Sequence, residues 1–165
     1  MRIVSIIGGS DSSENALKLA ESIGEEIAKR KLVLACGGLG GVMEAACRGA
    51  KKYGGLTIGI LPTDNKEAAN EYVDIAIPTG LGYARNFIVA KSGDAVIAIG
   101  GSAGTLSEMA IAWFSDKVIV ALPASGGWAE KIAGTKIDTR RNDKVHSATS
   151  PKEALDIIFR ELGWD

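Results

Sequence analysis

The chain has 165 residues, of which 46% are hydrophobic and 24% are charged, and its formal net charge at pH 7 is −1. A chain of this length is expected to form a single domain, residues 1–165, whose folding buries most of the surface of the unfolded chain. Its lysines and arginines are scattered among a similar number of acidic residues, so the broad basic face of a nucleic-acid-binding protein is missing and no nucleic-acid partner is expected.

Strand and helix patterns alternate along the whole chain. Runs of apolar, β-branched residues predict strands at residues 3–7, 32–36, 56–62, 74–78, 95–99 and 117–123, and a short edge strand at Val145. Apolar residues at helical spacing predict helices at residues 14–30, 42–53, 83–92, 106–113, 128–133 and 151–162. Because the strands are apolar on both faces, the expected fold class is α/β, a single-domain doubly wound parallel sheet of Rossmann-like type with helices on both faces.

Local patterns also predict how several of these helices begin and pack. An acidic capping pattern at residues 11–14 precedes the first helix, and Ser150-Pro151 opens the last one with a capping serine and a proline at the first helical position. The helix at 42–53 carries a stripe of small residues that includes Ala46 and Gly49. Such a stripe is expected to pack closely on the sheet.

The chain offers few residues for metal or nucleophilic chemistry. Cys36 and Cys47 are its only cysteines and lack the spacing of a zinc site, so both are expected to be small buried residues. With His146 as the sole histidine, we expect no metal site and no serine-histidine-aspartate triad. No signal peptide or membrane-spanning run is recognisable, so we expect a cytoplasmic protein without a membrane partner.

Three predicted strands end in glycine-rich turns that lead toward helices. A lone pair of glycines more often makes only a tight turn. Three such turns on one parallel sheet would share its carboxyl edge, where open α/β sheets bind ligands. There, bare backbone N–H groups and the positive ends of helices favour a phosphate. The predicted binding residues are Gly8, Gly9 and Ser10 in the first turn, Gly37, Gly38, Gly40, Gly41 and Met43 in the second, and Gly100, Gly101, Ser102, Ala103, Gly104 and Thr105 in the third.

Two familiar nucleotide fingerprints are missing from these turns. No G-x-x-x-x-G-K-[ST] sequence occurs, which argues against a P-loop nucleotidase. A dinucleotide-binding fold would have G-x-G-x-x-G after the first strand and an acidic residue at the end of the second. Here the first turn reads Gly8-Gly9-Ser10 and the second strand ends in Ala35-Cys36, so NAD binding is disfavoured.

Two charged side chains are candidates for contact with the ligand. Glu108 fits a capping box with Thr105, so it either caps its own helix or faces a ligand, beside the sugar or ring rather than the phosphate that it would repel. Arg85 lies near the start of the helix before strand 95–99. It is either a solvated helix residue or a clamp whose guanidinium binds two phosphate oxygens.

These residues resemble the LOG-like Rossmann superfamily, formerly labelled lysine decarboxylases. The resemblance spans nearly the whole chain and rests on Gly37-Gly38-x-x-Gly41-x-Met43, on Gly104-Thr105-x-x-Glu108 and on the preceding Arg85. The short length and residues 74–85 look most like the molybdenum cofactor carrier branch, whose members bind a phosphorylated pterin without converting it. The resemblance implies a homodimer or higher homo-oligomer that binds a small phosphorylated ligand, a nucleotide monophosphate or a molybdopterin-type molecule, and requires no cofactor.

The resemblance also implies an enzymatic alternative. The better-known relatives are phosphoribohydrolases, which release the base from cytokinin-type nucleoside 5′-monophosphates with an arginine and a glutamate that match Arg85 and Glu108. In such a reaction Glu108 would stabilise positive charge on the ribose or orient water, and Arg85 would hold the phosphate or the departing base. This chain departs from their pattern at Gly100-Gly101-Ser102, at Asn86 in place of lysine, and by lacking a histidine just before the arginine. A ligand-binding protein is therefore the primary prediction.

Overall fold

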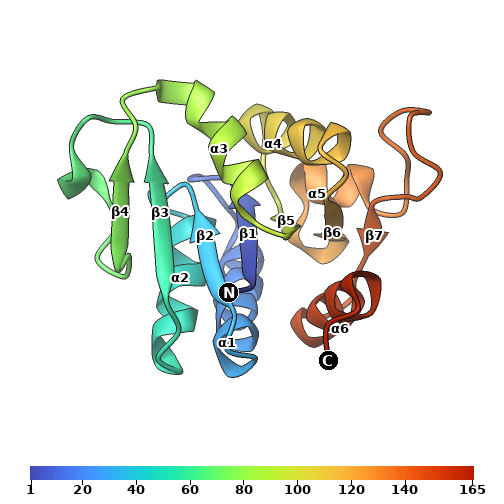
Figure 1. Cartoon of the computed structure of the whole chain (residues 1–165), viewed down its shortest axis with the longest axis horizontal. Helices are drawn as coiled ribbons and strands as arrows, with labels where there is room; N and C mark the ends of the chain where they lie inside the picture. The colour runs from blue at the N-terminus through green and yellow to red at the C-terminus, as the bar shows by residue number, and fades with distance from the viewer.

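The computed structural model describes all residues, 1–165, and contains one parallel sheet (Figure 1). Its strand order is β4-β3-β2-β1-β5-β6-β7. The strands are β1 (Ile3–Gly8), β2 (Val33–Cys36), β3 (Thr57–Leu61), β4 (Ile75–Pro78), β5 (Ala95–Ile99), β6 (Val118–Leu122) and β7 (His146–Ser147). Every neighbouring pair runs parallel, which confirms the predicted α/β fold class.

Helices cover both faces of the sheet, as the apolar strands predict. On one face, α1 (Glu14–Lys29), α2 (Val42–Lys52) and α6 (Pro151–Leu162) enclose a core of 26 buried residues. On the other face, α3 (Arg85–Ser92), α4 (Ala103–Phe114) and α5 (Gly127–Ile132) enclose a second core of 13 buried residues. Three short 3₁₀ turns complete the chain: η1 (Lys66–Ala68), η2 (Gly82–Ala84) and η3 (Pro123–Ser125).

The helix ends follow from local side-chain chemistry. The Ser150 hydroxyl accepts a hydrogen bond from Glu153 N at 3.2 Å, so the predicted start of α6 is confirmed. At α1 the capping residue is Ser13, whose hydroxyl accepts from Ala16 N at 3.1 Å. The edge strand lies one residue beyond its predicted position, because the backbone of Val145 pairs with Gly134 and Thr135 instead of β6.

Helices α1 and α2 approach each other through glycine. A Cβ atom on Gly24 would lie 1.9 Å from the Ala46 carbonyl oxygen, and one on Gly49 would lie 1.9 Å from the Glu21 carbonyl oxygen. Beside this contact, Arg48 donates two hydrogen bonds to the Glu21 carboxylate, at 2.8 and 3.0 Å. The predicted packing of Gly49 on the sheet is therefore corrected, because its open side faces a neighbouring helix.

Cys36 and Cys47 lie in the interior, at the contact between β2 and α2. Both side chains are fully buried, which confirms the sequence prediction, and their sulfur atoms are 3.6 Å apart as free thiols. No group of three or more histidine, cysteine, aspartate or glutamate side chains is arranged to hold a metal ion. None of the helices combines the length and the apolar character needed to cross a bilayer.

The order of the strands reverses direction at β1. The chain builds β1 to β4 outward on one side and then returns through α3 to place β5 directly beside β1. Helix α1 follows β1 on one face of the sheet, whereas α4 follows β5 on the other. The chain therefore leaves the carboxyl ends of β1 and β5 toward opposite faces of the sheet. Doubly wound sheets form a crevice for ligands at such a point.

Candidate functional site

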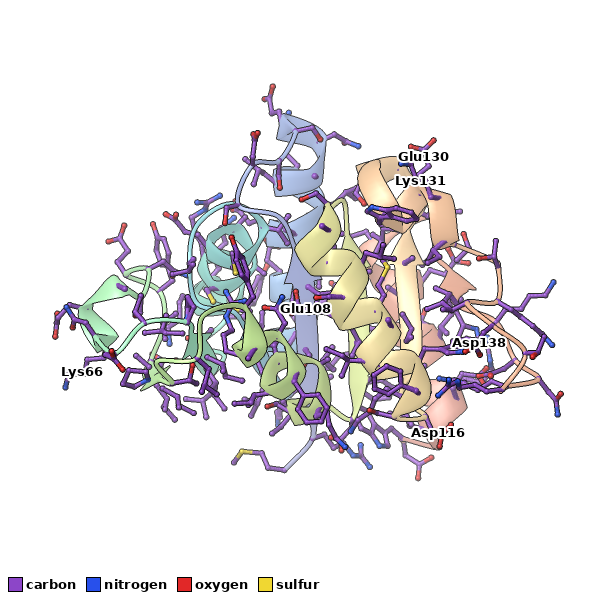
Figure 2. All side chains as sticks on the ribbon, turned by 90° about the horizontal axis from the view of Figure 1, so that it is seen from above. Lys66, Glu108, Asp116, Glu130, Lys131 and Asp138 are labelled. Atoms are coloured by element: carbon purple, nitrogen blue, oxygen red, sulfur yellow. The ribbon has the colours of Figure 1, made fainter.

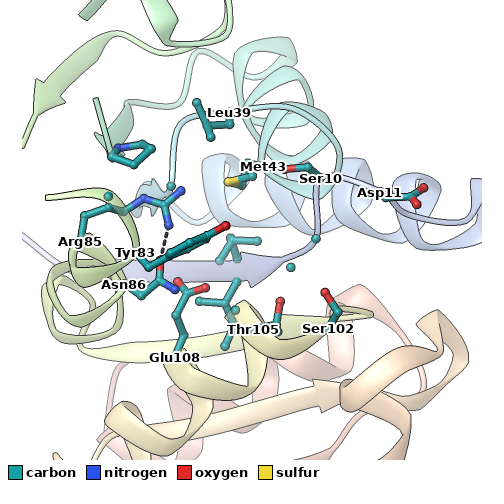
Figure 3. Close-up of a pocket in the computed structure, with 18 residues that line it drawn as sticks. Ser10, Asp11, Leu39, Met43, Tyr83, Arg85, Asn86, Ser102, Thr105 and Glu108 are labelled. Carbon is teal, nitrogen blue, oxygen red and sulfur yellow. Dashed lines mark hydrogen bonds between the residues drawn. The ribbon is translucent and has the colours of Figure 1, made fainter. Parts of the chain in front are cut away.

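A cavity of about 610 Å³ lies at this point, within the range of roughly 300–1,000 Å³ typical of small-molecule sites. Its walls come from the turns after β1, β2 and β5, from Pro62 after β3, and from the segment where η2 leads into α3 (Figure 3). Five distant parts of the sequence thus meet at one edge of the sheet. The cavity wall combines polar groups with an apolar part formed by residues such as Leu39 and Met43.

The cavity brings together residues from all three predicted glycine turns and both charged candidates. The predicted residues that line it are Gly8, Gly9, Ser10, Gly37, Met43, Ser102, Gly104, Thr105, Arg85 and Glu108. The predicted residues that do not line it are Gly38, Gly40, Gly41, Gly100, Gly101 and Ala103. Each turn therefore contributes some residues to the cavity wall and uses others to hold its own shape.

The second turn is shaped by Gly38 and Gly41, both of which have positive φ angles, of 77° and 64°. A Cβ atom on Gly41 would lie 2.3 Å from the Gly9 carbonyl oxygen, so this glycine lets the second turn pack on the first. The N–H of Gly38 donates to Cys36 Sγ at 3.3 Å, and its carbonyl accepts from Asn70 N at 2.9 Å. A Cβ atom on Gly40 would meet only the Glu44 carboxylate, at 3.9 Å.

In the third turn, the first two glycines are bound within the protein. Gly100 N donates to Ser125 Oγ at 2.7 Å, and the carbonyls of Gly100 and Gly101 accept from Ala129 N and Trp128 N, both at 3.1 Å. These two glycines line a smaller neighbouring hollow that they share with Ser125. Ala103 is the exposed first residue of α4. The cavity side of this turn is therefore Ser102, Gly104 and Thr105.

Unpaired backbone donors are found in the turn after β1 and at the start of α4. Helices α2 and α4 both lack a side-chain cap. The capping position of α2 is Gly41, which has no side chain, and that of α4 is Ser102, whose hydroxyl accepts no hydrogen bond from the helix. The N–H groups of Ser102, Gly104 and Thr105 make no hydrogen bond within the protein, nor do those of Gly9 and Ser10. Such donors at helix N-termini, together with the helix dipole, favour an anion.

Arg85 is the first residue of α3 and is only 9% exposed. Its Nη1 donates to Asn86 Oδ1, whereas its Nε is buried without any partner. Gly37 makes room for the guanidinium group, because a Cβ atom there would lie 2.7 Å from Arg85 Nη2. Burial lowers the pKa of Arg85, with Glu108 opposing the shift, yet an arginine stays protonated at neutral pH. The alternative of a solvated helix arginine is therefore wrong.

Glu108 is 6% exposed and makes no side-chain hydrogen bond within the protein. Because the N-cap position of α4 is Ser102 and not Thr105, Glu108 lies well inside the helix, and the capping-box alternative is wrong. Burial raises the pKa of Glu108 to about 8, although the positive charge of Arg85 opposes this shift. Seen from above, Glu108 lies near the middle of the molecule, while the other labelled charged residues lie toward its rim (Figure 2).

The structure adds two residues to the site: Asn86, which sequence reasoning named only as a departure from a family pattern, and Tyr83, which it included only within longer segments such as 74–85. Asn86, which is buried, accepts from Arg85 and donates through Nδ2 to Ser107 Oγ at 3.2 Å. Ser107 in turn donates to the Gly104 carbonyl at 2.6 Å, so the chain of contacts joins α3 to the start of α4. Tyr83 lines the cavity from η2. Their proximity to Arg85 in sequence was the available signal.

Comparison with known proteins assigns the family. The model of the SLOG cluster4 family matches residues 1–155. The chain belongs to the SLOG cluster4 family. This SLOG protein is 31% identical over 135 residues to a cytokinin riboside 5′-monophosphate phosphoribohydrolase from Mycobacterium marinum, an alignment that covers 72% of each chain.

Two solved structures resemble this SLOG protein over nearly its full length. The molybdenum cofactor binding protein from Rippkaea orientalis shares 39% sequence identity with a TM-score of 0.87, covering 98% of this chain and 97% of the other. The molybdenum cofactor carrier protein from Chlamydomonas reinhardtii shares 35% identity with a TM-score of 0.85, covering 99% of both chains. The predicted Rossmann-like fold and the resemblance to the LOG-like superfamily and its carrier branch are confirmed.

Proposed function

We propose that this protein binds a small phosphorylated ligand, of the phosphorylated-pterin or nucleotide kind, and holds it without cleaving it. The observation that carries the proposal is the single cavity in which unpaired N–H groups of the turn after β1 and of the α4 N-terminus meet the buried Arg85. The glycine turns would bind the phosphate, and Arg85 and Glu108 would flank the rest of the ligand. The similar solved structures described as molybdenum cofactor binding and carrier proteins support a pterin ligand.

The state of Glu108 favours binding over hydrolysis. With a pKa of about 8, its carboxyl group is mostly neutral at pH 7. A neutral carboxyl does not repel a nearby phosphate and can hydrogen-bond a sugar or ring. It also gives little electrostatic stabilisation to the positive charge that develops on ribose when an N-glycosidic bond breaks. At neutral pH the cavity is therefore better suited to holding a ligand than to cleaving it.

A phosphoribohydrolase is the second candidate function. It is favoured by the similarity to the Mycobacterium marinum enzyme and by the presence of Arg85 and Glu108 in one cavity. In this reaction water would add to the anomeric carbon as the bond to the base nitrogen breaks, giving ribose 5-phosphate and the free base. The ionised fraction of Glu108 would stabilise the ribose cation or orient the water, and Arg85 would hold the base or phosphate.

Binding and turnover can be measured on the same sample. We expect calorimetry to show saturable binding of AMP or of neopterin 3′-phosphate, a fluorescent phosphorylated pterin, while chromatography detects no free base from AMP or from cytokinin-type monophosphates. Base release that the Glu108→Gln variant abolishes would establish the second candidate instead. Absence of binding by both ligands, with no turnover, would reject both functions. Mass spectrometry of the natively purified protein would identify a ligand that it carries.

Arg85 provides the sharpest variant for this test. Replacing it by methionine in Arg85→Met keeps the buried volume but removes charge-assisted hydrogen bonds, each worth about 1.5–3 kcal/mol. We expect the affinity for phosphorylated ligands to fall at least about tenfold. The matched control is Arg160→Met, because Arg160 is exposed on α6, far from the cavity in sequence and outside its lining. Equal affinities in the two variants would contradict a ligand-binding role for Arg85.

The proposed protein partner is a second copy of the chain. Helices α3 and α4 pack side by side and leave large apolar side chains exposed, with Phe87 50% and Phe114 48% accessible. Ile88 extends the same exposed apolar character on α3. A face of this kind can be buried against an identical face through twofold symmetry, and a net charge of −1 opposes such pairing very little. Because both helices begin at the cavity, this interface would lie next to the ligand site.

A further inference from the structure

Tyr83 occupies an unusual position for a large aromatic side chain. It lies in η2, two residues before Arg85, and it is 91% exposed although it is one of the residues that line the cavity. In Figure 3 its ring extends across the cavity in front of Asn86, on the same side as Arg85 and away from Ser10 and Ser102. The residue thus stands over the cavity opening and not over the protein core.

The backbone that carries Tyr83 is firmly attached, while its ring is free. Gly82 N donates to the Pro62 carbonyl at 2.9 Å, and Thr79 Oγ1 donates to the Leu61 carbonyl at 2.6 Å, so the segment is held at the end of β3. The Tyr83 ring takes part in none of the aromatic or cation–π contacts of the protein, and its hydroxyl makes no hydrogen bond. An anchored aromatic ring with both faces open is suited to stacking on a ligand.

The rest of the cavity indicates what this ring would contact. Its apolar side chains include Leu39 and Met43, which Figure 3 places together on the wall above Tyr83. Ser10 and Ser102, whose N–H groups make no hydrogen bond, lie toward the right-hand end of the cavity in the same view, with Ser10 next to Met43. A ligand whose phosphate is bound at that end would extend its remaining part between Tyr83 and the apolar wall. A flat aromatic ring of the ligand would gain the most binding energy in this position. One of its faces would contact the Tyr83 ring and the other the apolar wall with the Met43 thioether, and both kinds of contact are favourable.

We infer that Tyr83 is a specificity-determining residue, whose ring stacks on a planar heteroaromatic ring of the phosphorylated ligand. The inference rests on the proposed function and adds that the ligand is selected by its ring as well as by its phosphate. Its hydroxyl is not required, because the interaction uses the face of the side-chain ring. Tyr83 would therefore discriminate a nucleotide or a phosphorylated pterin from a sugar phosphate that lacks a ring system.

The test compares AMP with ribose 5-phosphate, which carries the same phosphate and sugar without the base. In calorimetric titrations we expect Tyr83→Ala to lower the affinity for AMP about tenfold, in line with the roughly 1–3 kcal/mol measured when an aromatic side chain that stacks on a base is removed. The affinity for ribose 5-phosphate should change less than about twofold. Tyr83→Phe should bind both ligands like the natural protein. Tyr53→Ala is the matched control, because Tyr53 is also exposed but lies at the end of α2 outside the cavity.

Each remaining outcome is decisive. Equal losses for AMP and ribose 5-phosphate in Tyr83→Ala would overturn the inference, and a change in oligomeric mass beside them would assign Tyr83 to a protein contact. Unchanged AMP binding in Tyr83→Ala would also overturn it. If the natural protein bound neither AMP nor neopterin 3′-phosphate, the proposed function itself would fail. That failure can be told apart from failure of the inference, because it is seen with the natural protein alone and needs no variant.

Discussion

Glu108 is a carboxyl group held away from bulk water beside a buried guanidinium group that forms no ion pair with it. Its folded-state pKa of about 8 lies above the usual value of 4.5. Between these two pH values the folded state retains a proton that the unfolded state releases, so the free energy of unfolding decreases as pH rises through this window. A residue that lines the cavity therefore destabilises the fold at neutral pH.

Replacing Glu108 by glutamine removes this pH dependence. At pH 7 we expect Glu108→Gln to have a higher free energy of unfolding than the natural protein, by an amount on the order of 3 kcal/mol. The advantage should be small near pH 4.5, where Glu108 is protonated in the folded state and already half protonated in the unfolded state. Thermal unfolding measured between pH 4.5 and 8 checks this, with Glu67→Gln on the exposed turn η1 as the control. Parallel stability profiles for the natural protein and Glu108→Gln would contradict the buried, proton-bearing carboxyl.

At the scale of elements, Gly24 and Gly49 let the backbones of α1 and α2 approach each other closely. Because no Cβ atom can fit at Gly49, Gly49→Ala is expected to lower the free energy of unfolding by about 1–3 kcal/mol, despite the better helix propensity of alanine. Urea denaturation measures this change. Gly40→Ala is the control, since its Cβ atom would find its nearest neighbour at 3.9 Å. An equally stable Gly49→Ala protein would show that the helices can separate without strain.

Most elements could be predicted from the sequence because their signals are local. The buried strand β5 is a run of apolar residues that ends at glycines, and α6 begins with its own capping serine and proline. The environment of Arg85 could not be predicted, because it depends on Gly37, a residue distant in sequence whose missing side chain makes room for the guanidinium group. Sequence alone also left open whether Glu108 is a cap, since its match to a capping pattern does not reveal that α4 starts at Ala103.

The same distinction between local and distant contacts applies within the glycine turns. All three could be placed at one edge of the sheet, because parallel strands share their carboxyl ends. Which glycines face the cavity could not be predicted. Gly100 gives its N–H to Ser125, which is 25 residues away in sequence, and Gly41 packs on the turn after β1. Both roles arise from tertiary contacts that no local spacing encodes.

At the scale of the whole molecule, the exposed apolar side chains of α3 and α4 predict self-association. We expect sedimentation to give a mass of twice 17.2 kDa for the natural protein at micromolar concentration. Phe87→Lys should shift the protein toward the monomer, because two lysines would meet across a twofold interface. Tyr53→Lys, at an exposed position on the opposite face of the sheet, should leave the mass unchanged. A natural protein that sediments as a monomer would contradict a second copy as the partner.

Helices α2, α3 and α4 all begin at the same edge of the sheet. Their dipoles therefore make this edge more positive than the rest of the molecule, even though the acidic and basic residues nearly balance. The peptide units of these helices direct their positive ends to the rim where the cavity opens, so a dianion drifting past would be turned toward that rim by oriented amides rather than by a field of lysines. Attraction of this kind acts within one or two helical turns and leaves the outer surface close to neutral. Capture of the ligand therefore need not draw in the long polyanions that would compete for a basic face.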